Sequence, residues 1–343
     1  MFIIVVKLTG IGMRGFIFLI VAVLLLFSPE LFSGITLTKY AGAYLEKGVG
    51  ARPFGMGGAF TALSEDVTSI YWNPAGLVNI KKIEFHGMHA ERFSGIVNWD
   101  FGGIAARVND NTSLGIGYFR LGIDGIPLTK LTDPSQELGE IIIDDNGREI
   151  RNIPYAYKYV NDSESALFFS FARKRNENLY YGGSIKFLYK TVGNYDAWGL
   201  GFDIGIIYKP LDSLKLGLLI SDGTSTVLAW NTGRRELILP HLRIGSAYSF
   251  KYSFLHFIPV FDMSMNFENR EFSQIKINRV GINVHTGLEI RFKKLLAFRL
   301  GSDKGLFTAG SGITLSNFRI DYGFSRHTEL GNTHRISLTY LLD

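Results

Sequence analysis

The side chains of this 343-residue chain that can do chemistry do not gather into a compact motif. Asp203 and His285 are an acid and a base of the kind used in catalysis, but no Ser/His/Asp spacing accompanies them. The GMGG run at 55–58 lacks the Lys-Ser/Thr that completes a phosphate-binding loop. Metal-ligand spacing is lacking and there is no cysteine, although Asp144 and Asp145 can form either a calcium site or a solvated acidic loop. We therefore predict a protein without catalytic activity or cofactor.

A second set of polar residues recurs along the chain at strand-like spacing. In VGINVHTGLEIRF, residues 280–292, Asn283, His285, Glu289 and Arg291 share one face. Such side chains either line a path for a solute or form ion pairs that hold a barrel wall to its contents, and both interpretations stay open. The residues that we predict to line the lumen are Lys186, Asp203, Asn283, His285, Glu289, Arg291, Arg319 and Asp321.

The segments that carry these residues alternate between apolar and polar side chains. In FRIDYGFSR, Phe318, Ile320 and Tyr322 share one face, whereas Arg319 and Asp321 share the other. Successive side chains of a strand point to opposite faces, so the pattern predicts strands with one apolar face. These faces run for about 9–11 residues, the length of a tilted membrane strand. We predict an all-β, transmembrane antiparallel barrel, with a soluble β-protein as the alternative.

Fourteen segments show this pattern, and an even number is what bacterial single-chain barrels have. Short turns are expected at the periplasmic end and longer links at the outer end, the longest from 122 to 163. Pro259 lies within a strand pattern and indicates a bulge or a local break. Aromatic residues near the strand ends suit interfacial girdles: Tyr180, Tyr181, Tyr189, Trp198 and Tyr208. The predicted strands are 82–93, 94–108, 112–122, 164–175, 178–192, 196–209, 213–221, 238–250, 254–267, 279–292, 294–302, 305–315, 317–325 and 333–342.

Composition and the N-terminus agree with export to the outer membrane. Hydrophobic residues make up 46% of the chain and charged residues 20%, and the net charge of +5 is not concentrated, which gives no support for nucleic-acid binding. Arg14 precedes the apolar run 15–27, which is too short for an ordinary spanning helix. We predict a signal peptide at 1–34, with an uncleaved anchor as the alternative.

Between the signal and the first strand lies a glycine-rich, partly helical segment, 35–80. Irregular backbone at membrane depth is tolerated only inside protein or a wet cavity, so we predict that this segment is a hatch in the lumen. Ser64 is expected to cap a short helix, with Glu65 and Asp66 in its first turn. The residues predicted to shape the hatch, by close approach to the wall or by an Asn-Pro turn, are Gly55, Gly57, Gly58, Asn73, Pro74 and Ala75.

The stretch GARPFGMGGAFTALSEDVTSIYWNPAGL, residues 50–77, resembles the N-terminal signature of the PorV/PorQ family and of the related FadL-type transporters of hydrophobic compounds. The resemblance implies a fourteen-stranded outer-membrane barrel whose N-terminal hatch carries the Asn-Pro-Ala motif. Beyond these residues the barrel portion matches only in pattern. Many such barrels end in an aromatic residue, whereas this chain ends in Asp343.

Two functions are compatible with this resemblance. In the first, the barrel passes hydrophobic small molecules past its hatch. In the second, it is an interaction or shuttle component that receives secreted cargo proteins from a type IX-like system. Both place the chain among outer-membrane lipids, with 1–34 as signal peptide, 35–80 as hatch and 81–343 as barrel.

Overall fold

The computed structural model describes residues 35–36, 41–92, 95–144, 146–268, 273–293, 295–327 and 331–342. The predicted signal peptide at 1–34 and residues Asp145 and Asp343 lie outside the described residues. Within the described ranges, no helix has both the length and the apolar character needed to cross a membrane.

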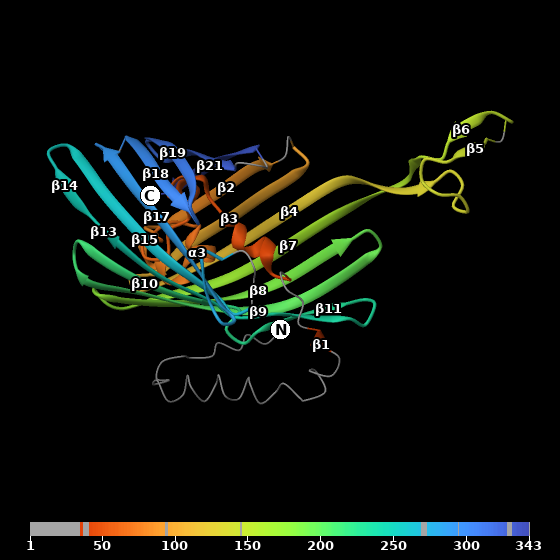
Figure 1. The fold of residues 1–343 in the computed structure, drawn as a ribbon. Coiled ribbons are helices and arrows are strands. Elements are labelled where there is room, and N and C mark those ends of the chain that lie inside the picture. The colour runs from red at the N-terminus through yellow and green to blue at the C-terminus, as the bar shows by residue number, and fades with distance from the viewer. Residues whose placement is uncertain are drawn as a thin grey trace.

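Fourteen antiparallel strands close into a barrel (Figure 1), which confirms the predicted fold. The barrel closes where β21 pairs with β2, with Leu342 opposite Ile83. The wall strands, in order, are β2 (Ile83–Arg92), β3 (Val97–Asn109), β4 (Thr112–Leu131), β7 (Pro154–Asn176), β8 (Leu179–Val192), β9 (Tyr195–Leu211), β10 (Leu214–Ser221), β13 (His241–Tyr248), β15 (Leu255–Asn266), β17 (Val280–Phe292), β18 (Leu296–Asp303), β19 (Leu306–Leu315), β20 (Phe318–His327) and β21 (Gly331–Leu342).

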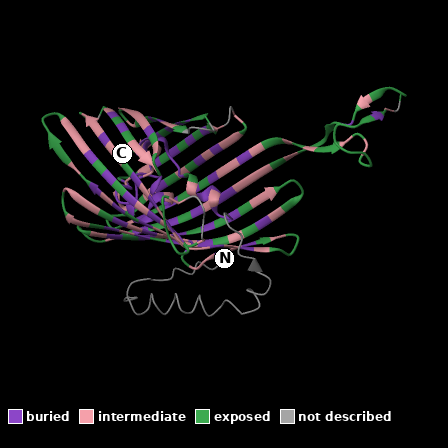
Figure 2. Ribbon diagram, viewed as in Figure 1, coloured by how far each residue is buried: buried purple, intermediate pink, exposed green. Residues whose placement is uncertain are grey.

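The two faces of the wall differ as the alternation predicts. On β20, Phe318 and Ile320 are 48% and 47% exposed, whereas Asp321 is completely buried. Figure 2 shows the same alternation of exposed and buried residues along the wall strands. Apolar side chains therefore cover the outside of the barrel, where hydrocarbon can solvate them, and polar ones turn inward.

The two ends of the barrel also differ. One end has the tight turns at 110–111, 177–178, 212–213 and 316–317, and it holds both ends of the barrel portion. In outer-membrane barrels such turns face the periplasm, so we call this the periplasmic end. The opposite, outer end carries longer excursions, which contain β11 (Thr226–Trp230), β12 (Arg235–Ile238) and β16 (Ile275–Ile277).

At the outer end, β4 and β7 continue well beyond their neighbours. They are 20 and 23 residues long and pair as far as Leu131 and Pro154, so much of the expected 122–163 link is strand. The β-favouring tyrosines at 155, 157 and 159 explain this extension. A small second sheet, β5 (Ile141–Ile143) and β6 (Glu149–Arg151), forms the tip of this arm (Figure 1).

Pro259 breaks the sheet on one side only. It keeps its register with β17, opposite Leu288. On the other side the partner of β15 changes from β13 at Val260 to the short strand β14 (Phe250–Tyr252) at Phe257. A proline has no N–H to donate, so this gap costs the ladder no hydrogen bond at that residue. The predicted local break is therefore confirmed.

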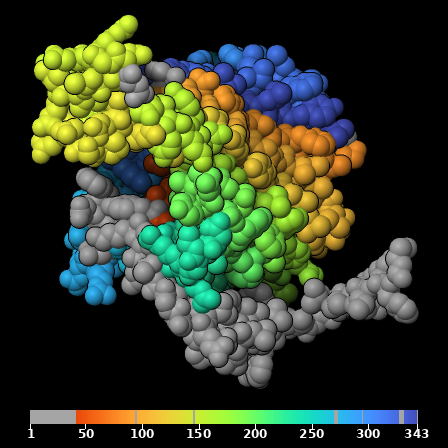
Figure 3. Space-filling model, turned by 90° about the vertical axis from the view of Figure 1, so that its right-hand side faces the viewer, coloured from red at the N-terminus to blue at the C-terminus, as the bar shows by residue number. Residues whose placement is uncertain are grey.

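Residues 41–80, which we call the lumen segment, run through the inside of the barrel (Figure 1). Their short helices are η2 (Ala43–Lys47), α2 (Ala51–Gly55), α3 (Ser69–Trp72) and η3 (Pro74–Asn79). Upstream, β1 (Ile35–Thr36) pairs with β12 at the outer end, and downstream β2 starts at the periplasmic end. Seen from the outer end, the segment is visible inside the mouth of the barrel (Figure 3).

The predicted helix cap at Ser64 is wrong. The helix α3 begins at Ser69, and the Ser64 hydroxyl instead donates to the carbonyl of Phe60 at 2.8 Å. The carboxylate of Asp66 accepts hydrogen bonds from the N–H and the hydroxyl of Thr68, at 3.0 and 2.5 Å. This local turn competes with the helix and moves its start by one turn.

Candidate functional site

The lumen segment touches the wall where the wall has glycine. A Cβ placed on Gly301 of β18 would lie 2.5 Å from the backbone nitrogen of Gly57, and one on Gly217 of β10 would lie 2.6 Å from the carbonyl oxygen of Thr61. Neither distance is compatible with a side chain. The wall thus admits the backbone of the lumen segment at van der Waals contact.

The predicted glycines of the segment lie in this contact. Gly57 and Gly58 have φ of +65° and +72°, which side-chain-bearing residues rarely adopt. Thr308 of β19 joins both ends of the turn, because its hydroxyl accepts from Gly57 N at 2.9 Å and donates to the carbonyl of Gly55 at 3.2 Å.

The Asn73-Pro74-Ala75 turn is fixed by the side chain of Asn73. Its Oδ1 accepts from the N–H of Ala75 at 3.2 Å, and Pro74 begins η3 at the position where a missing N–H costs least. Its Nδ2 donates to the carbonyl oxygens of Thr61 and of Ile206 in the wall, at 2.9 and 3.1 Å. One buried amide therefore joins the turn to the rest of the segment and to β9.

A second anchor, Asp262 on β15, escaped the sequence analysis. Its Oδ2 accepts from the N–H groups of Phe60 and Thr61 at 3.1 and 3.0 Å, and from the Thr61 hydroxyl at 2.6 Å. Asp262 has the signal that identified its neighbours, a polar residue alternating with apolar ones at 261 and 263.

Four of the predicted lumen residues belong to one buried ion network around Arg52. Glu289 accepts from Nε of Arg52 at 3.0 Å, and Arg291 approaches Glu289 to 2.6 Å. Arg319 bonds to Asp321 in the wall. Arg52 also reaches Glu65 of the lumen segment at 2.9 Å. These charges therefore tie the segment to the barrel.

The same network extends to Asp66 and Arg299. Arg319 donates to Asp66 at 2.7 Å, and Arg299 donates to Glu289 at 2.6 Å. Burial would raise the pKa of Asp66, but the guanidinium groups of Arg319 and Arg52 outweigh it and lower that pKa to about 2. Asp66 is thus a carboxylate at neutral pH. Removing one partner from such a buried pair typically costs about 3–5 kcal/mol.

On the opposite wall, Lys186 and Asp203 meet as an ion pair of 2.8 Å. Lys186 also contacts Asp222, at 2.9 Å, and Asp222 accepts from the hydroxyl of Thr226 at 2.5 Å. Asp222 and Thr226 were missed because they lie in the excursion after β10, where the strand pattern gives no face.

His285 and Asn283 have separate partners. Nε2 of His285 lies 3.1 Å from the hydroxyl of Ser264, and Nδ1 lies 2.9 Å from a carboxylate oxygen of Asp303 and 3.1 Å from the carbonyl of Gly57. The contact with Gly57 has the geometry of a hydrogen bond. The imidazole therefore links the wall to the lumen segment. Asn283 accepts from the N–H of Gln274.

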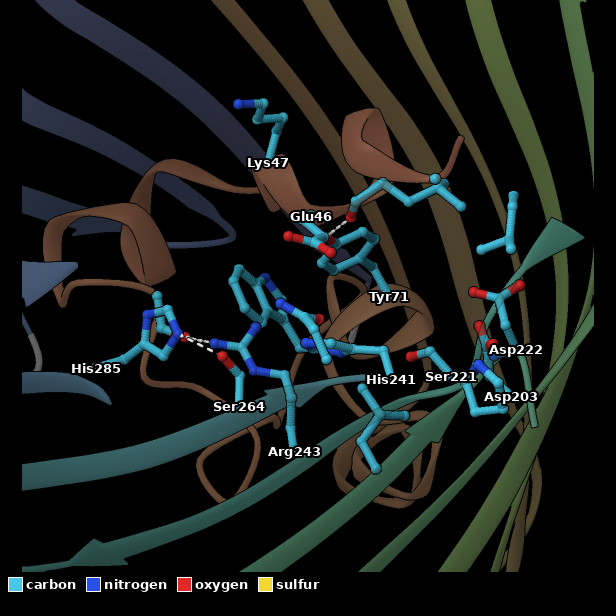
Figure 4. A pocket seen from close by; sticks show the side chains of 18 of the residues that line it. Glu46, Lys47, Tyr71, Asp203, Ser221, Asp222, His241, Arg243, Ser264 and His285 are labelled. Carbon is cyan, nitrogen blue, oxygen red and sulfur yellow. Dashed lines mark hydrogen bonds between the residues drawn. The ribbon is translucent and has the colours of Figure 1, made fainter. Parts of the chain in front are cut away.

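A chamber opens above the lumen segment at the outer end of the barrel (Figure 4). Its empty space is about 1000 Å³, part of it open to solvent. Glu46 and Lys47 come from the segment, whereas Arg243 and Ser264 come from the wall. Among the described residues, no group of three or more His, Cys, Asp or Glu is placed to hold a metal ion. The apolar lining includes Leu45, Phe54, Trp72, Phe168, Leu219 and Ile238.

Cations lie on the aromatic rings of the chamber. The guanidinium of Arg243 lies 4.8 Å from the ring centre of Trp72, and that of Arg335 lies 4.1 Å from that of Phe54. Arg335 also donates to the carbonyl of Gly48 at 3.0 Å. Burial raises the pKa of Tyr71 to about 12, so its phenol stays neutral at this chamber.

The fold and this site define a class: a fourteen-strand barrel of the outer-membrane type with a protein segment fixed in its lumen. No family model matches the chain, and no curated protein matches it. Among solved structures, the Ralstonia pickettii toluene transporter TbuX has 14% identity and a TM-score of 0.57, covering 87% of this chain and 99% of that one.

Two further solved structures have the same fold. The CymD monoaromatic hydrocarbon channel has 16% identity and a TM-score of 0.56, with 86% of this chain and 98% of that one covered. A Pseudomonas aeruginosa FadL homologue has 11% identity and a TM-score of 0.52, with 86% and 98% covered. At this identity the likeness establishes the fold and leaves the function to be argued from the site.

Proposed function

We propose that this chain is an outer-membrane barrel of PorV/PorQ type that passes hydrophobic small molecules, without catalysis, past a hatch formed by residues 35–80. The observation that carries this proposal is the chamber, which places apolar and aromatic side chains beside the lumen segment. The titles of the similar structures name a toluene transporter and a monoaromatic hydrocarbon channel, which supports the same class of solute.

The proposed hatch is held too firmly to leave the barrel as a unit. The amide of Asn73, the carboxylate of Asp262 and the ion network of Arg52 all bind it to the wall. Passage therefore needs a local rearrangement beside the chamber. The short helix η2 lines the chamber through Leu45, Glu46 and Lys47, so we expect the rearrangement there. We assign Gly55, Gly57, Gly58 and the turn at 73–75 the role of holding the hatch, and the lumen charges that of anchoring it.

Uptake of N-phenylnaphthylamine by whole Gram-negative cells tests this function, because the outer leaflet excludes this dye and it fluoresces once inside. Cells that carry the protein should take it up faster than cells without it. Ile238→Arg places a charge in the chamber and should abolish the gain. Ile277→Arg, on an exposed residue outside the chamber, is the matched control. Equal uptake with Ile238→Arg and the unchanged protein would overturn the proposal, and unchanged sensitivity to vancomycin excludes simple leakage.

The second candidate function is an interaction component of a secretion or surface-assembly system. The arm of β4 and β7 favours it, because this hairpin extends past the wall and carries large exposed apolar residues such as Leu138 and Ile143, 68% and 73% exposed. If dye uptake matches that of cells without the protein while the arm binds a protein ligand, this second function is the better one.

A further inference from the structure

The arm at the outer end extends beyond the barrel wall. Along β4, pairing with β3 ends where Ile123 lies opposite Val97. Along β7, pairing with β8 starts where Asp162 lies opposite Val192. Beyond these points the described ladder joins β4 and β7 to each other, and Figure 1 shows the hairpin projecting from the barrel. Its surface therefore faces water and not lipid.

The tip of the arm is an ordered structure. Asn152 is completely buried, and its Nδ2 donates to the carbonyl oxygens of Asp133, Gln136 and Glu137 at 2.9, 3.1 and 3.1 Å. Its Oδ1 accepts from the N–H of Asp133 at 3.0 Å. The amide thus satisfies the backbone of the loop before β5 and fixes that loop against β6.

One edge of the tip sheet is open. Within the described residues, β6 is the only strand beside β5. Asn152 N donates to Glu140 O at 2.7 Å, and Asp144 N donates to Arg148 O at 2.9 Å. In an antiparallel ladder every second residue turns its backbone N–H and C=O toward the partner strand, and the alternate residues turn theirs the other way. The N–H and C=O groups of Ile141 and Ile143 therefore point away from β6, where another strand can pair with them.

The side chains on this edge do not protect it. Soluble edges are usually blunted by lysine, proline or a covering loop, because an open edge is a template for another chain. Here the edge carries Ile141 and Ile143, which are 70% and 73% exposed. Leu138 and Ile153 nearby are 68% and 58% exposed. Such a group of large apolar residues in water marks a binding surface.

The surroundings of the edge are acidic. Arg148 and Arg151 are the two bases between residues 132 and 153. The described carboxylates of the same stretch are Asp133, Glu137, Glu140, Asp144 and Glu149. Electrostatic complementarity therefore favours a basic partner. A second copy of the acidic tip, or an anionic membrane surface, would be repelled.

We propose that the β5 edge binds an extended basic segment of another protein, which adds to the tip sheet as a third strand. Backbone hydrogen bonds to Ile141 and Ile143 would supply the pairing, and alternate apolar side chains of the segment would cover the exposed isoleucines. Lysine or arginine between them would meet the carboxylates. This inference does not depend on what passes through the lumen.

A fluorescent peptide, Lys-Val-Lys-Val-Lys-Val-Lys, tests the proposal against the whole protein in neutral-lipid nanodiscs, with anisotropy as readout. It should bind the unchanged protein. The double variant Ile141→Pro with Ile143→Pro removes the two outward N–H groups but leaves the β6 ladder, and it should weaken binding by roughly tenfold or more. Ile141→Thr with Ile143→Thr keeps both N–H groups and should weaken binding less.

Two further probes separate strand addition from other contacts. The same peptide with an N-methyl group on every residue should not bind, because neither of its edges can then donate to the ladder. Glu149→Lys should weaken binding in low salt and have little effect in high salt. The proposal is wrong if the N-methylated peptide binds equally well or if the proline variant, shown by protease resistance to keep its tip, binds unchanged. Sedimentation that shows dimers through the tip would identify a second copy as the occupant and also overturn it.

Discussion

The side-chain oxygen of Asn73 occupies the space that a side chain on Gly205 would need. A Cβ on Gly205 would lie 2.0 Å from Oδ1 of Asn73. The Asn-Pro-Ala turn of the lumen segment and a glycine of β9 therefore require each other, although 132 positions separate them in the sequence (205 minus 73).

Gly205→Ala should displace this turn from the wall. The added methyl group cannot fit beside Asn73, so the amide loses its bond to the carbonyl of Ile206 and a polar group is left unpaired, at a cost of about 1–3 kcal/mol. We expect ion conductance in planar bilayers to rise above that of the unchanged protein. Gly87→Ala is the control, because no atom of the described residues lies within 4 Å of a Cβ at that position. Equal conductance of the two variants would show that the turn does not seal the lumen.

Removal of residues 35–79 should leave a folded barrel that conducts ions, whereas the intact protein conducts little. The wall strands form their ladder without the segment, but the space that it fills becomes water. Asn73→Ala with Pro74→Ala should conduct at an intermediate level, because the turn loosens and the segment stays. Conductance of single channels measures all three proteins. A wide pore in the intact protein, or a sealed deletion variant, would exclude the hatch assignment.

The parts of this structure that the sequence predicts are those with a local signal. Ile320 and Asp321 alternate within one strand, so their faces follow from a period of two. The partner of Glu289 cannot be predicted in this way, because Arg52 lies 237 positions away and its approach depends on the register of the whole barrel. The charges were therefore recognised as facing the lumen, but their pairing was not.

Errors arose where a local preference met a competing contact. Ser64 has a residue type suited to a helix cap, but the carboxylate of Asp66 takes the donors of Thr68 and moves the helix start. At the arm, Tyr155 and Tyr157 alternate as a strand should, yet turn-forming residues around them led us to expect a long link. Asp262 and Arg299 were missed although they share the alternation that identified their neighbours.

Arg52→Ala should destabilise the barrel by about 3–5 kcal/mol, because it leaves Glu289 buried with a partner lost. Arg107→Ala is a matched control that removes an exposed pair with Asp110, and it should cost less than about 1 kcal/mol. The temperature at which the barrel loses its compact migration in detergent gels compares the two. Similar shifts for both variants would contradict the anchoring role of the network.

The contribution of Asp66 to the free energy of unfolding should fall as the pH is lowered. Its pKa falls from 3.8 to about 2 in the folded protein, so its stabilisation is fully present above about pH 4 and is lost as the pH falls through 2. A shift of this size corresponds to about 2.5 kcal/mol. The difference in unfolding free energy between the unchanged protein and Asp66→Asn should therefore be constant from pH 7 to about 4 and shrink below it. A difference that grows on acidification would contradict this assignment.

The two faces of β20 should respond differently to substitution. Ile320→Arg places a charge against lipid and should cost about 2–4 kcal/mol near the midplane, whereas Ile320→Val should be mild. The sequence alone predicts that Arg319→Ser is much milder than Ile320→Arg unless its ion pair holds the hatch. Arg319 does pair with Asp66 and Asp321, so we expect Arg319→Ser to destabilise the barrel too. Arg319→Ser should also raise ion conductance, whereas Ile320→Arg should leave it unchanged. Gel migration after heating gives the stability of each variant and bilayer recording gives its conductance. If both variants raised conductance equally, the seal would depend on the intact wall and not on the bond between Arg319 and the lumen segment.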